Sequence, residues 1–143
     1  LSEGSRSIID YALQLARPFN ASVEVLHAWE PPQYVAPDLL VAAPGWNPLS
    51  LEQVALDTAG KELATLLRQM AQPSVELKHR VVVGEAASTI LELVEKEGFD
   101  LIVMGTHGRR GLSRVLLGSV AQKLVARAPC PVLTLHVPQD TQK

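Results

Sequence analysis

The chain has 143 residues, which is the length of one ordinary domain, and 47% of them are hydrophobic while 20% are charged. This composition excludes an intrinsically disordered chain, and the single cysteine excludes an internal disulfide framework and a cysteine-based metal cage. No apolar run approaches the ~18 residues that span a bilayer, and the first residues do not form a signal peptide. We therefore expect one cytoplasmic domain over residues 1–143, without a membrane partner.

A net charge of −2 conceals an uneven distribution of charge along the sequence. Of the 15 acidic residues, 14 lie between Glu3 and Asp100, and none lies from Leu101 to Gln139. That last segment carries five basic residues, which are Arg109, Arg110, Arg114, Lys123 and Arg127. Such a segment favours an anionic partner, although basic residues near a helix can equally be solvated. A pI of about 6.1 argues against general nucleic-acid binding.

The first half of the sequence predicts two helices and two strands. Apolar residues recur at helical spacing over 5–17, and residues 21–29 have the character of a β-strand. Residues 30–48 contain five prolines and predict a long loop, which we interpret as a lid or an interaction surface. Helical spacing returns over 51–70, and a strand follows over 75–83.

The second half repeats this alternation. We expect a helix over 85–97 that ends at Gly98, a short apolar strand over 100–104, a helix over 118–128 and a last strand over 131–137. Strands separated by helices predict parallel pairing with right-handed crossovers, and hence an open α/β sheet with helices on both faces.

The predicted sheet lacks a strand ahead of its first helix. An amphipathic helix needs a sheet to cover its apolar face, and only four strands are visible in the sequence. We therefore expect that a further strand would precede Leu1.

The stretch from Gly105 to Ser119, GTHGRRGLSRVLLGS, is the most informative part of the sequence. It leaves the carboxyl end of a strand, where open α/β sheets bind ligands, and glycines at 105, 108 and 111 permit positive φ and close approach. A helix that opens at Gly118 and Ser119 offers N–H groups and a positive dipole end to a phosphate. Ser119 and Gln122 also match a capping box, so Ser119 has a structural interpretation as well.

This loop matches neither of the two common phosphate-binding motifs. It lacks the lysine of a P-loop and the G-x-G-x-x-G pattern of a dinucleotide site. Because phosphoryl transfer needs such a lysine or a metal carboxylate, the loop favours binding over catalysis.

The spacing Gly105-x2-Gly108-x9-Gly118-Ser119 resembles the G-x2-G-x9-G-[ST] motif of the universal stress protein family, in its ATP-binding branch. The resemblance extends over essentially the whole chain and includes the Val83-Gly84 turn. It implies a Rossmann-like, five-stranded parallel sheet of order 3-2-1-4-5, whose first strand would lie before Leu1. It also implies a homodimer formed through the last strand, residues 131–137.

Carried over by position, the resemblance implies a set of nucleotide-binding residues: Ala28, Met104, Gly105, Gly108, Gly118, Ser119 and Val120. Ala28 would contact adenine, the first two glycines would lie against the ribose and phosphates, and the residues from Gly118 to Val120 would hold the phosphates. Ala28 stands where the family usually has a larger valine, which loosens that contact. His107, Arg109 and Arg110 would assist the phosphates or remain solvated.

The resemblance implies an ATP-binding regulatory protein of the stress response, with Mg²⁺ accompanying ATP and cyclic AMP as a less favoured ligand. Nucleotide binding would bias the dimer or loop 30–50 toward an unknown protein partner. Two alternatives stay open: a slow ATPase or autophosphorylating enzyme, with Thr106 and Ser113 as acceptors, and an interaction module that does not bind nucleotide. We expect no catalytic residue. We also expect no metal site, because His27, His79 and His136 lack ligand spacing.

Overall fold

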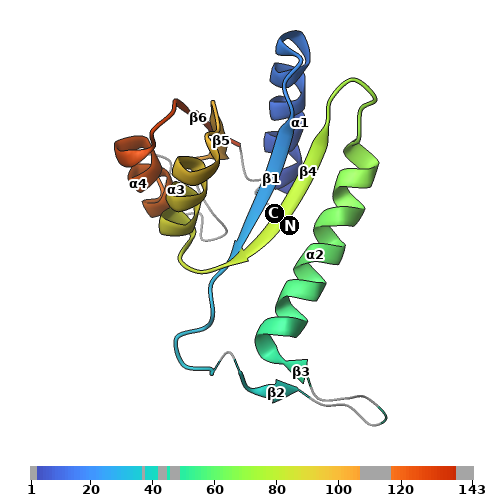
Figure 1. Cartoon of the computed structure of the whole chain (residues 1–143), viewed down its shortest axis with the longest axis vertical. Coiled ribbons are helices and arrows are strands. Elements are labelled where there is room, and N and C mark those ends of the chain that lie inside the picture. Colours follow the sequence, from blue (N-terminus) through green and yellow to red (C-terminus); the bar gives the residue numbers. More distant parts are fainter. Residues whose placement is uncertain (1–2, 37, 42–44, 46–48, 107–116, 138–143) are drawn as a thin grey trace, which may run out of the picture.

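The computed structural model describes residues 3–36, 38–41, 45, 49–106 and 117–137. The helices are α1 (Glu3–Ala16), α2 (Leu51–Met70), α3 (Ala86–Glu97) and α4 (Ser119–Arg127), with a 3₁₀ turn η1 (Arg17–Phe19) after the first (Figure 1). The strands are β1 (Val23–Trp29), β2 (Leu40–Val41), β3 (Leu49–Ser50), β4 (Leu77–Val83), β5 (Ile102–Gly105) and β6 (Val132–Leu135). The alternation of four helices with four longer strands is confirmed.

The parallel strands form two separate pairs. β1 pairs with β4 from Val23↔Leu77 to Trp29↔Val83, and β5 pairs with β6 from Ile102↔Val132 to Gly105↔Leu135. Both pairs are parallel, as predicted, and within the described residues no ladder joins β1 to β5. The parallel α/β architecture is therefore confirmed, while the five-strand order stays a prediction.

The proline-rich loop contains structure that its sequence did not indicate. β2 and β3 pair antiparallel through Leu40↔Ser50 and Val41↔Leu49, and the backbone N–H of Leu51 donates to Leu39 O at 2.8 Å. The prediction of a loop over 30–48 is therefore wrong at Leu40–Val41, which forms a short strand paired with Leu49–Ser50 just beyond that range. Ser50 and Gln53 then form a reciprocal capping box at the start of α2.

A hydrophobic core lies between the β1–β4 pair and the first two helices. Its buried residues come from α1, α2 and the segment before β4: Ile9, Leu13, Ala16, Leu63, Leu67 and Val75. Val23 and Val25 pack against this cluster from β1, because alternate residues of a strand face the same side of a sheet.

The remaining two helices lie on the other side of the strands. Figure 1 shows α3 and α4 opposite α2 across the β1–β4 pair, and their buried residues are Ala87, Val94, Ala121 and Leu124. Gly98 ends α3 in the left-handed conformation, with φ 72°, as predicted for a helix C-terminus. Helices therefore cover both faces of the parallel strands.

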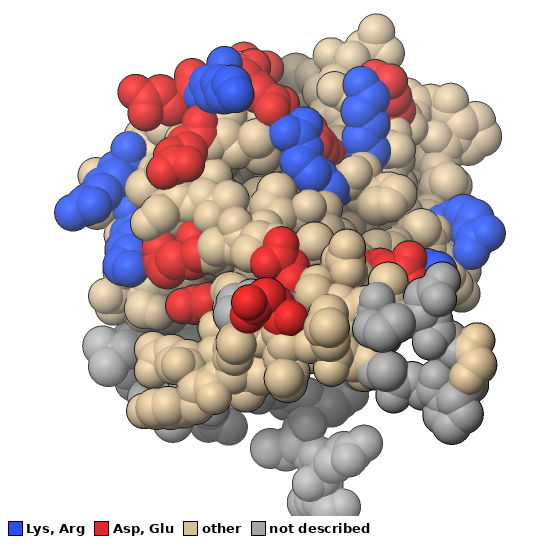
Figure 2. All heavy atoms as spheres, turned by 60° about the horizontal axis from the view of Figure 1, so that its bottom comes forward, with Lys and Arg blue, Asp and Glu red and all other residues tan. Residues whose placement is uncertain are grey.

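Basic and acidic side chains lie beside each other on the upper part of the face that Figure 2 shows. Arg80 forms ion pairs with Glu24 at 2.8 Å and with Glu97 at 2.6 Å, which link β4 to β1 and to α3. The hydrogen bonds that Arg80 donates to Glu97 hold the pKa of Glu97 below its ordinary value. None of the helices in the described part of the chain is long and apolar enough to cross a membrane.

Candidate functional site

The end of β5, the end of β6 and the start of α4 meet at one corner of the molecule. The backbone N–H of Gly118 donates to Thr106 O at 2.7 Å, and the N–H of Thr106 donates to Leu135 O at 2.9 Å. Gly105 is the last residue of β5 and pairs with Leu135. We call this arrangement the β5–α4 corner; it contains Gly105, Thr106, Gly118, Ser119 and His136.

The amino end of α4 has no side-chain cap. Its N-cap residue is Gly118, with φ −59° and ψ 155°, and a glycine has no side chain that could accept a hydrogen bond from the first turn. Ser119 is the first helical residue, and the side chain of Gln122 donates to Leu117 O at 2.8 Å. The capping-box interpretation of Ser119 and Gln122 is therefore wrong. The first-turn amide groups of a helix need partners, and an anion is one group that can supply them.

Gly105 has a different conformation from the one that its place in a glycine loop indicated. Among the described glycines, positive φ occurs at Gly45, Gly84 and Gly98, whereas Gly105 continues the strand. Gly105 therefore does not use the positive φ that a glycine permits, while close approach of a ligand to its backbone stays a prediction.

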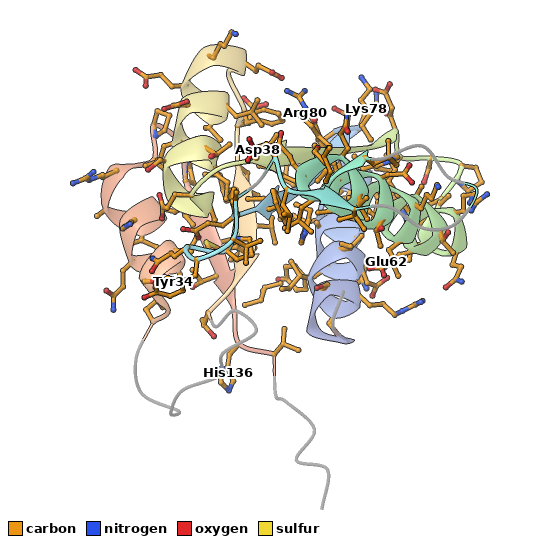
Figure 3. The ribbon with its side chains drawn as sticks, turned by 90° about the horizontal axis from the view of Figure 1, so that it is seen from below. Tyr34, Asp38, Glu62, Lys78, Arg80 and His136 are labelled. Carbon is orange, nitrogen blue, oxygen red and sulfur yellow. The ribbon has the colours of Figure 1, made fainter. Side chains whose placement is uncertain are left out.

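Thr106 and His136 are corner residues whose proximity the sequence analysis missed. The Thr106 Oγ1 lies 3.4 Å from His136 Nδ1, and Figure 3 shows His136 beyond the end of β6. Each residue directly follows one of two paired parallel strands. That shared position is a signal from which their proximity could have been predicted.

One cation of the basic segment is already paired. Lys123 Nζ lies 3.1 Å from Glu85 Oε1, so this lysine joins α4 to the start of α3. Glu85 Oε2 accepts hydrogen bonds from the hydroxyl and the backbone N–H of Ser88 at 2.6 and 2.9 Å. The Ser88 hydroxyl first, then its N–H, then Lys123 lower the pKa of Glu85 to about 2. Lys123 therefore belongs to a helix–helix contact.

The structure brings together only some of the predicted nucleotide-binding residues. Gly105, Gly118 and Ser119 lie at the corner, Val120 follows Ser119 in α4, and Met104 precedes Gly105 in β5. Ala28 lies on β1, in the other strand pair, where it faces Val82 in the ladder. The remaining predicted residues lie outside the described part of the chain; they are His107, Gly108, Arg109 and Arg110.

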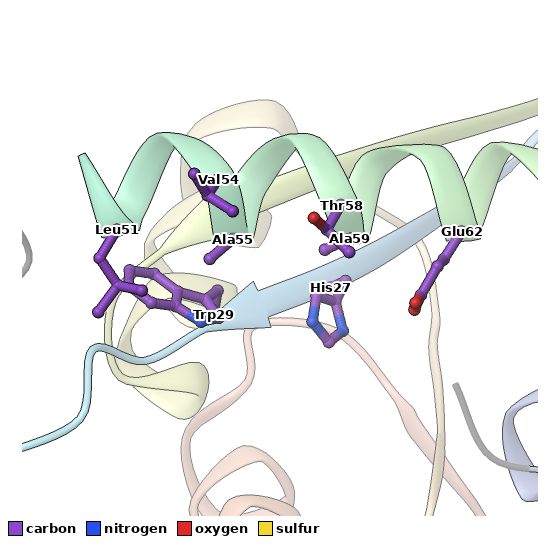
Figure 4. A pocket seen from close by; sticks show the side chains of 8 residues that line it. All are labelled: His27, Trp29, Leu51, Val54, Ala55, Thr58, Ala59 and Glu62. Carbon is purple, nitrogen blue, oxygen red and sulfur yellow. The ribbon is translucent and has the colours of Figure 1, made fainter. Parts of the chain in front are cut away.

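A cavity of about 270 Å³ lies elsewhere, between β1 and the first half of α2 (Figure 4). Its lining residues are His27, Trp29, Leu51, Val54, Ala55, Thr58, Ala59 and Glu62. Because side chains alternate along a strand, Ala28 faces away from the side that His27 and Trp29 occupy. None of the lining residues belongs to the β5–α4 corner, so the cavity is distinct from it.

Metal ligands do not gather in the part of the chain that the structure describes. No three His, Cys, Asp or Glu side chains lie close enough there to hold an ion.

A glycine-containing turn that leaves a parallel strand and enters a helix without a side-chain cap is typical of nucleotide-binding α/β proteins. The sequence profile of the Universal stress protein family matches residues 1–136, and the chain belongs to this family. The predicted family resemblance is thereby confirmed.

Individual relatives agree with this assignment. Universal stress protein MJ0531 of Methanocaldococcus jannaschii is 34% identical over 139 residues, which cover 96% of this chain and 78% of the relative. The structure of universal stress protein UspA from Lactobacillus plantarum matches with a TM-score of 0.70 at 23% identity, over 94% of this chain and 91% of that one. A universal stress protein in complex with cAMP matches with a TM-score of 0.58 at 26% identity, over 96% and 92%.

Proposed function

We propose that this protein binds an adenine nucleotide, ATP in particular, at the β5–α4 corner, and that it acts as a regulatory protein of the stress response. The observation that carries the proposal is the uncapped start of α4 at Gly118, held 2.7 Å from Thr106 O at the end of β5. A helix start of this kind favours phosphate through its N–H groups and its dipole. The absence of carboxylates from Leu101 to Gln139 removes the nearest source of repulsion along the sequence.

The parts of the nucleotide would be held by different elements. The Ser119 hydroxyl and the backbone N–H groups of Ser119 and Val120 would bind phosphate oxygens. Gly105 and Gly108 would lie against the ribose and phosphates, Ala28 would contact adenine, and Met104 would lie at the entry of the glycine stretch. His107, Arg109 and Arg110 would add positive charge near the phosphates.

Mg²⁺ fits this site only as an ion that the phosphates of the nucleotide coordinate. The ion prefers oxygen ligands and usually takes one or two carboxylates together with phosphate oxygens. At the corner the described side chains offer the hydroxyls of Thr106 and Ser119, and the sequence from Leu101 to Gln139 has no carboxylate. The phosphates would therefore supply the charged ligands of the ion.

The similarity to a universal stress protein solved with cAMP supports an adenine ligand. The amino end of a helix binds one phosphate group, whatever the number of further phosphates attached to it. AMP and cAMP therefore compete with ATP in this proposal. Regulation requires that the nucleotide bind one state of the protein more tightly than another. We propose that the nucleotide favours either the homodimer joined through residues 131–137 or a conformation of loop 30–50 that binds a protein partner.

The test is the substitution Gly118→Val, read by calorimetric titration with ATP, AMP and cAMP. The φ and ψ of Gly118 are open to any residue, so the fold should persist while the branched side chain blocks the phosphate. We expect ATP binding to be abolished in this variant. Gly60→Ala is the matched control, because a Cβ at Gly60 in α2 meets nothing within 4 Å.

Retained ATP affinity in the folded Gly118→Val protein would contradict the proposal. Incubation of the native protein with labelled ATP separates binding from catalysis. A regulatory binder leaves the nucleotide intact over hours, whereas release of phosphate or labelling of the chain would indicate the enzyme alternative.

A further inference from the structure

The core between β1 and α2 does not extend along the full length of these two elements. Val23 and Val25 of β1 pack against the buried cluster that contains Leu63 of α2. The next residues on the same face of β1 are His27 and Trp29, because side chains alternate along a strand. These two residues line the cavity of about 270 Å³ instead (Figure 4). The cavity therefore follows the core toward the carboxyl end of β1.

Small residues on one face of α2 account for this cavity. The residues of α2 that line it recur at helical spacing, so they share a face: Leu51, Val54, Ala55, Thr58, Ala59 and Glu62. Figure 4 shows Ala55 opposite Trp29 on β1. Ala59 lies opposite His27 in the same view. An alanine side chain ends at its Cβ, so it does not reach across to the strand.

The two ends of the cavity differ in their chemistry. Trp29 and Leu51 lie at one end, and Glu62 lies at the other (Figure 4). Among the described lining residues, Thr58 and Glu62 are exposed and the others are half-buried. With histidine counted as neutral, Glu62 is the one charged residue among them. An apolar, half-buried end and a carboxylate at an exposed position match an amphipathic ligand with a positively charged group.

We propose that this cavity binds a small primary amine that carries an aromatic ring. The ring would pack against the Trp29 indole and the side chains of Leu51 and Val54, which offer apolar surface at that end. The ammonium group would donate hydrogen bonds to the Glu62 carboxylate, whose two oxygens accept several donors. The Thr58 hydroxyl offers the ammonium group a further acceptor.

The volume of the cavity limits the size of this amine. At about 30 Å³ for each water-sized group, the 270 Å³ hold about nine non-hydrogen atoms. That is about the size of phenethylamine, a benzene ring with a short aminoalkyl chain. The Glu62 carboxylate would repel the phosphates of a nucleotide. The cavity and the β5–α4 corner therefore select ligands of opposite charge.

The experiment titrates the full chain with phenethylamine and follows binding by NMR. The signals observed are the indole N–H of Trp29 and the backbone amides of α2. Trp29→Phe identifies the indole signal, because the chain has a second tryptophan, Trp46. Two further probes have the same ring and a chain of similar length: phenethyl alcohol is neutral, and hydrocinnamate carries a carboxylate.

We expect saturable shifts with phenethylamine at the Trp29 indole and at the amides of Val54 and Thr58. Hydrocinnamate should bind at least about 5-fold more weakly, because Glu62 attracts the amine and repels the carboxylate. Glu62→Gln should weaken the binding of phenethylamine by about 2–5-fold, the range that an exposed ion pair supports, and leave that of phenethyl alcohol unchanged. Glu52→Gln is the matched control and should change neither, since Glu52 lies on the same helix but does not line the cavity.

Ala59→Leu tests the location of the site. The leucine side chain would occupy the cavity, and α2 should persist because leucine is also a strong helix former. We expect this variant to lose saturable binding of both phenethylamine and phenethyl alcohol. Gly118→Val, which blocks the proposed phosphate site, should leave the affinity for phenethylamine unchanged. Failure of nucleotide binding and failure of amine binding are thereby distinguished.

Several outcomes would overturn the proposal. They include a lack of saturable shifts with phenethylamine, equal affinity for hydrocinnamate, and equal effects of Glu62→Gln and Glu52→Gln. Retained binding in a folded Ala59→Leu protein would do the same, and the exposed Glu62 keeps the test decisive if that variant does not fold. Loss of phenethylamine binding in Gly118→Val would place the amine at the β5–α4 corner instead. Displacement of the amine by adenosine would assign the cavity to a nucleobase.

Discussion

The β1–β4 pair and the β5–β6 pair differ in what they contribute to the protein. Each strand of the first pair has seven residues, and the pair is packed against α1 and α2 through a cluster of six buried residues. Each strand of the second pair has four residues, and its ends form the β5–α4 corner. The comparison indicates that core stability is concentrated in one part of the chain and the candidate ligand site in the other.

The largest effect is expected from the substitution of a core leucine in the first part. Leu63 in α2 is 0% exposed, and Leu63→Ala should lower the free energy of unfolding by about 2–5 kcal/mol because it leaves a cavity. Leu63 belongs to α2, which lies across β1 and β4 from α4 (Figure 1), so ATP affinity should stay unchanged at temperatures where the variant is folded. Urea denaturation and calorimetric titration measure the two quantities.

Leu124→Ala is the counterpart in the second part, since Leu124 in α4 is also 0% exposed. It should cost a similar free energy of unfolding and, unlike Leu63→Ala, should also weaken ATP binding, because α4 carries the proposed phosphate site. Equal ATP affinities in the two variants would argue against the division between stability and binding.

A glycine where β4 ends gives the next effect in size. Gly84 has φ 139°, and a Cβ there would lie 2.7 Å from the Thr89 hydroxyl oxygen. Gly84→Ala should therefore lower the free energy of unfolding by about 1–3 kcal/mol. Gly60→Ala, in the interior of α2 with open space around it, should raise stability by about 0.5–1 kcal/mol. The melting temperatures of the two variants should shift in opposite directions. A shift of both in the same direction would refute the steric explanation.

Local features of the fold were predictable from the sequence. The helix predicted over 51–70 coincides with α2, and Gly98 ends α3 as predicted, because apolar periodicity and terminal glycines are local signals. The β2–β3 pair was missed since two residues per strand are too few for an alternating pattern. The division of the sheet into two pairs also depends on non-local pairing, which periodicity does not encode.

The candidate site was predictable only in outline. The position of the glycine stretch between strand and helix indicated the corner, and the structure places Gly105 and Gly118 there. The N-cap of α4 and the contact between Thr106 and His136 depend on backbone angles and on neighbouring strands, which the sequence pattern did not specify. The pairing of Lys123 with Glu85 joins residues 38 positions apart and reduces the free positive charge that composition indicated.

The smallest effect concerns the contact between α3 and α4, and it depends on pH. The pKa of Glu85 is lowered to about 2 from an ordinary 4.5, so its carboxylate stabilises the fold above pH 4.5, and this contribution is lost as the pH falls through 2. Glu85→Gln should lower the free energy of unfolding at pH 7 by about 0.5–1 kcal/mol, because the residue caps α3 through Ser88 N–H. The difference from the native protein should shrink between pH 4.5 and 2 in denaturant titrations. Asp57→Asn, which breaks an exposed ion pair within α2, is the control and should change stability by only about 0.3–0.5 kcal/mol. A Glu85→Gln difference that persists undiminished at pH 2 would show that the carboxylate charge does not stabilise the contact between these two helices.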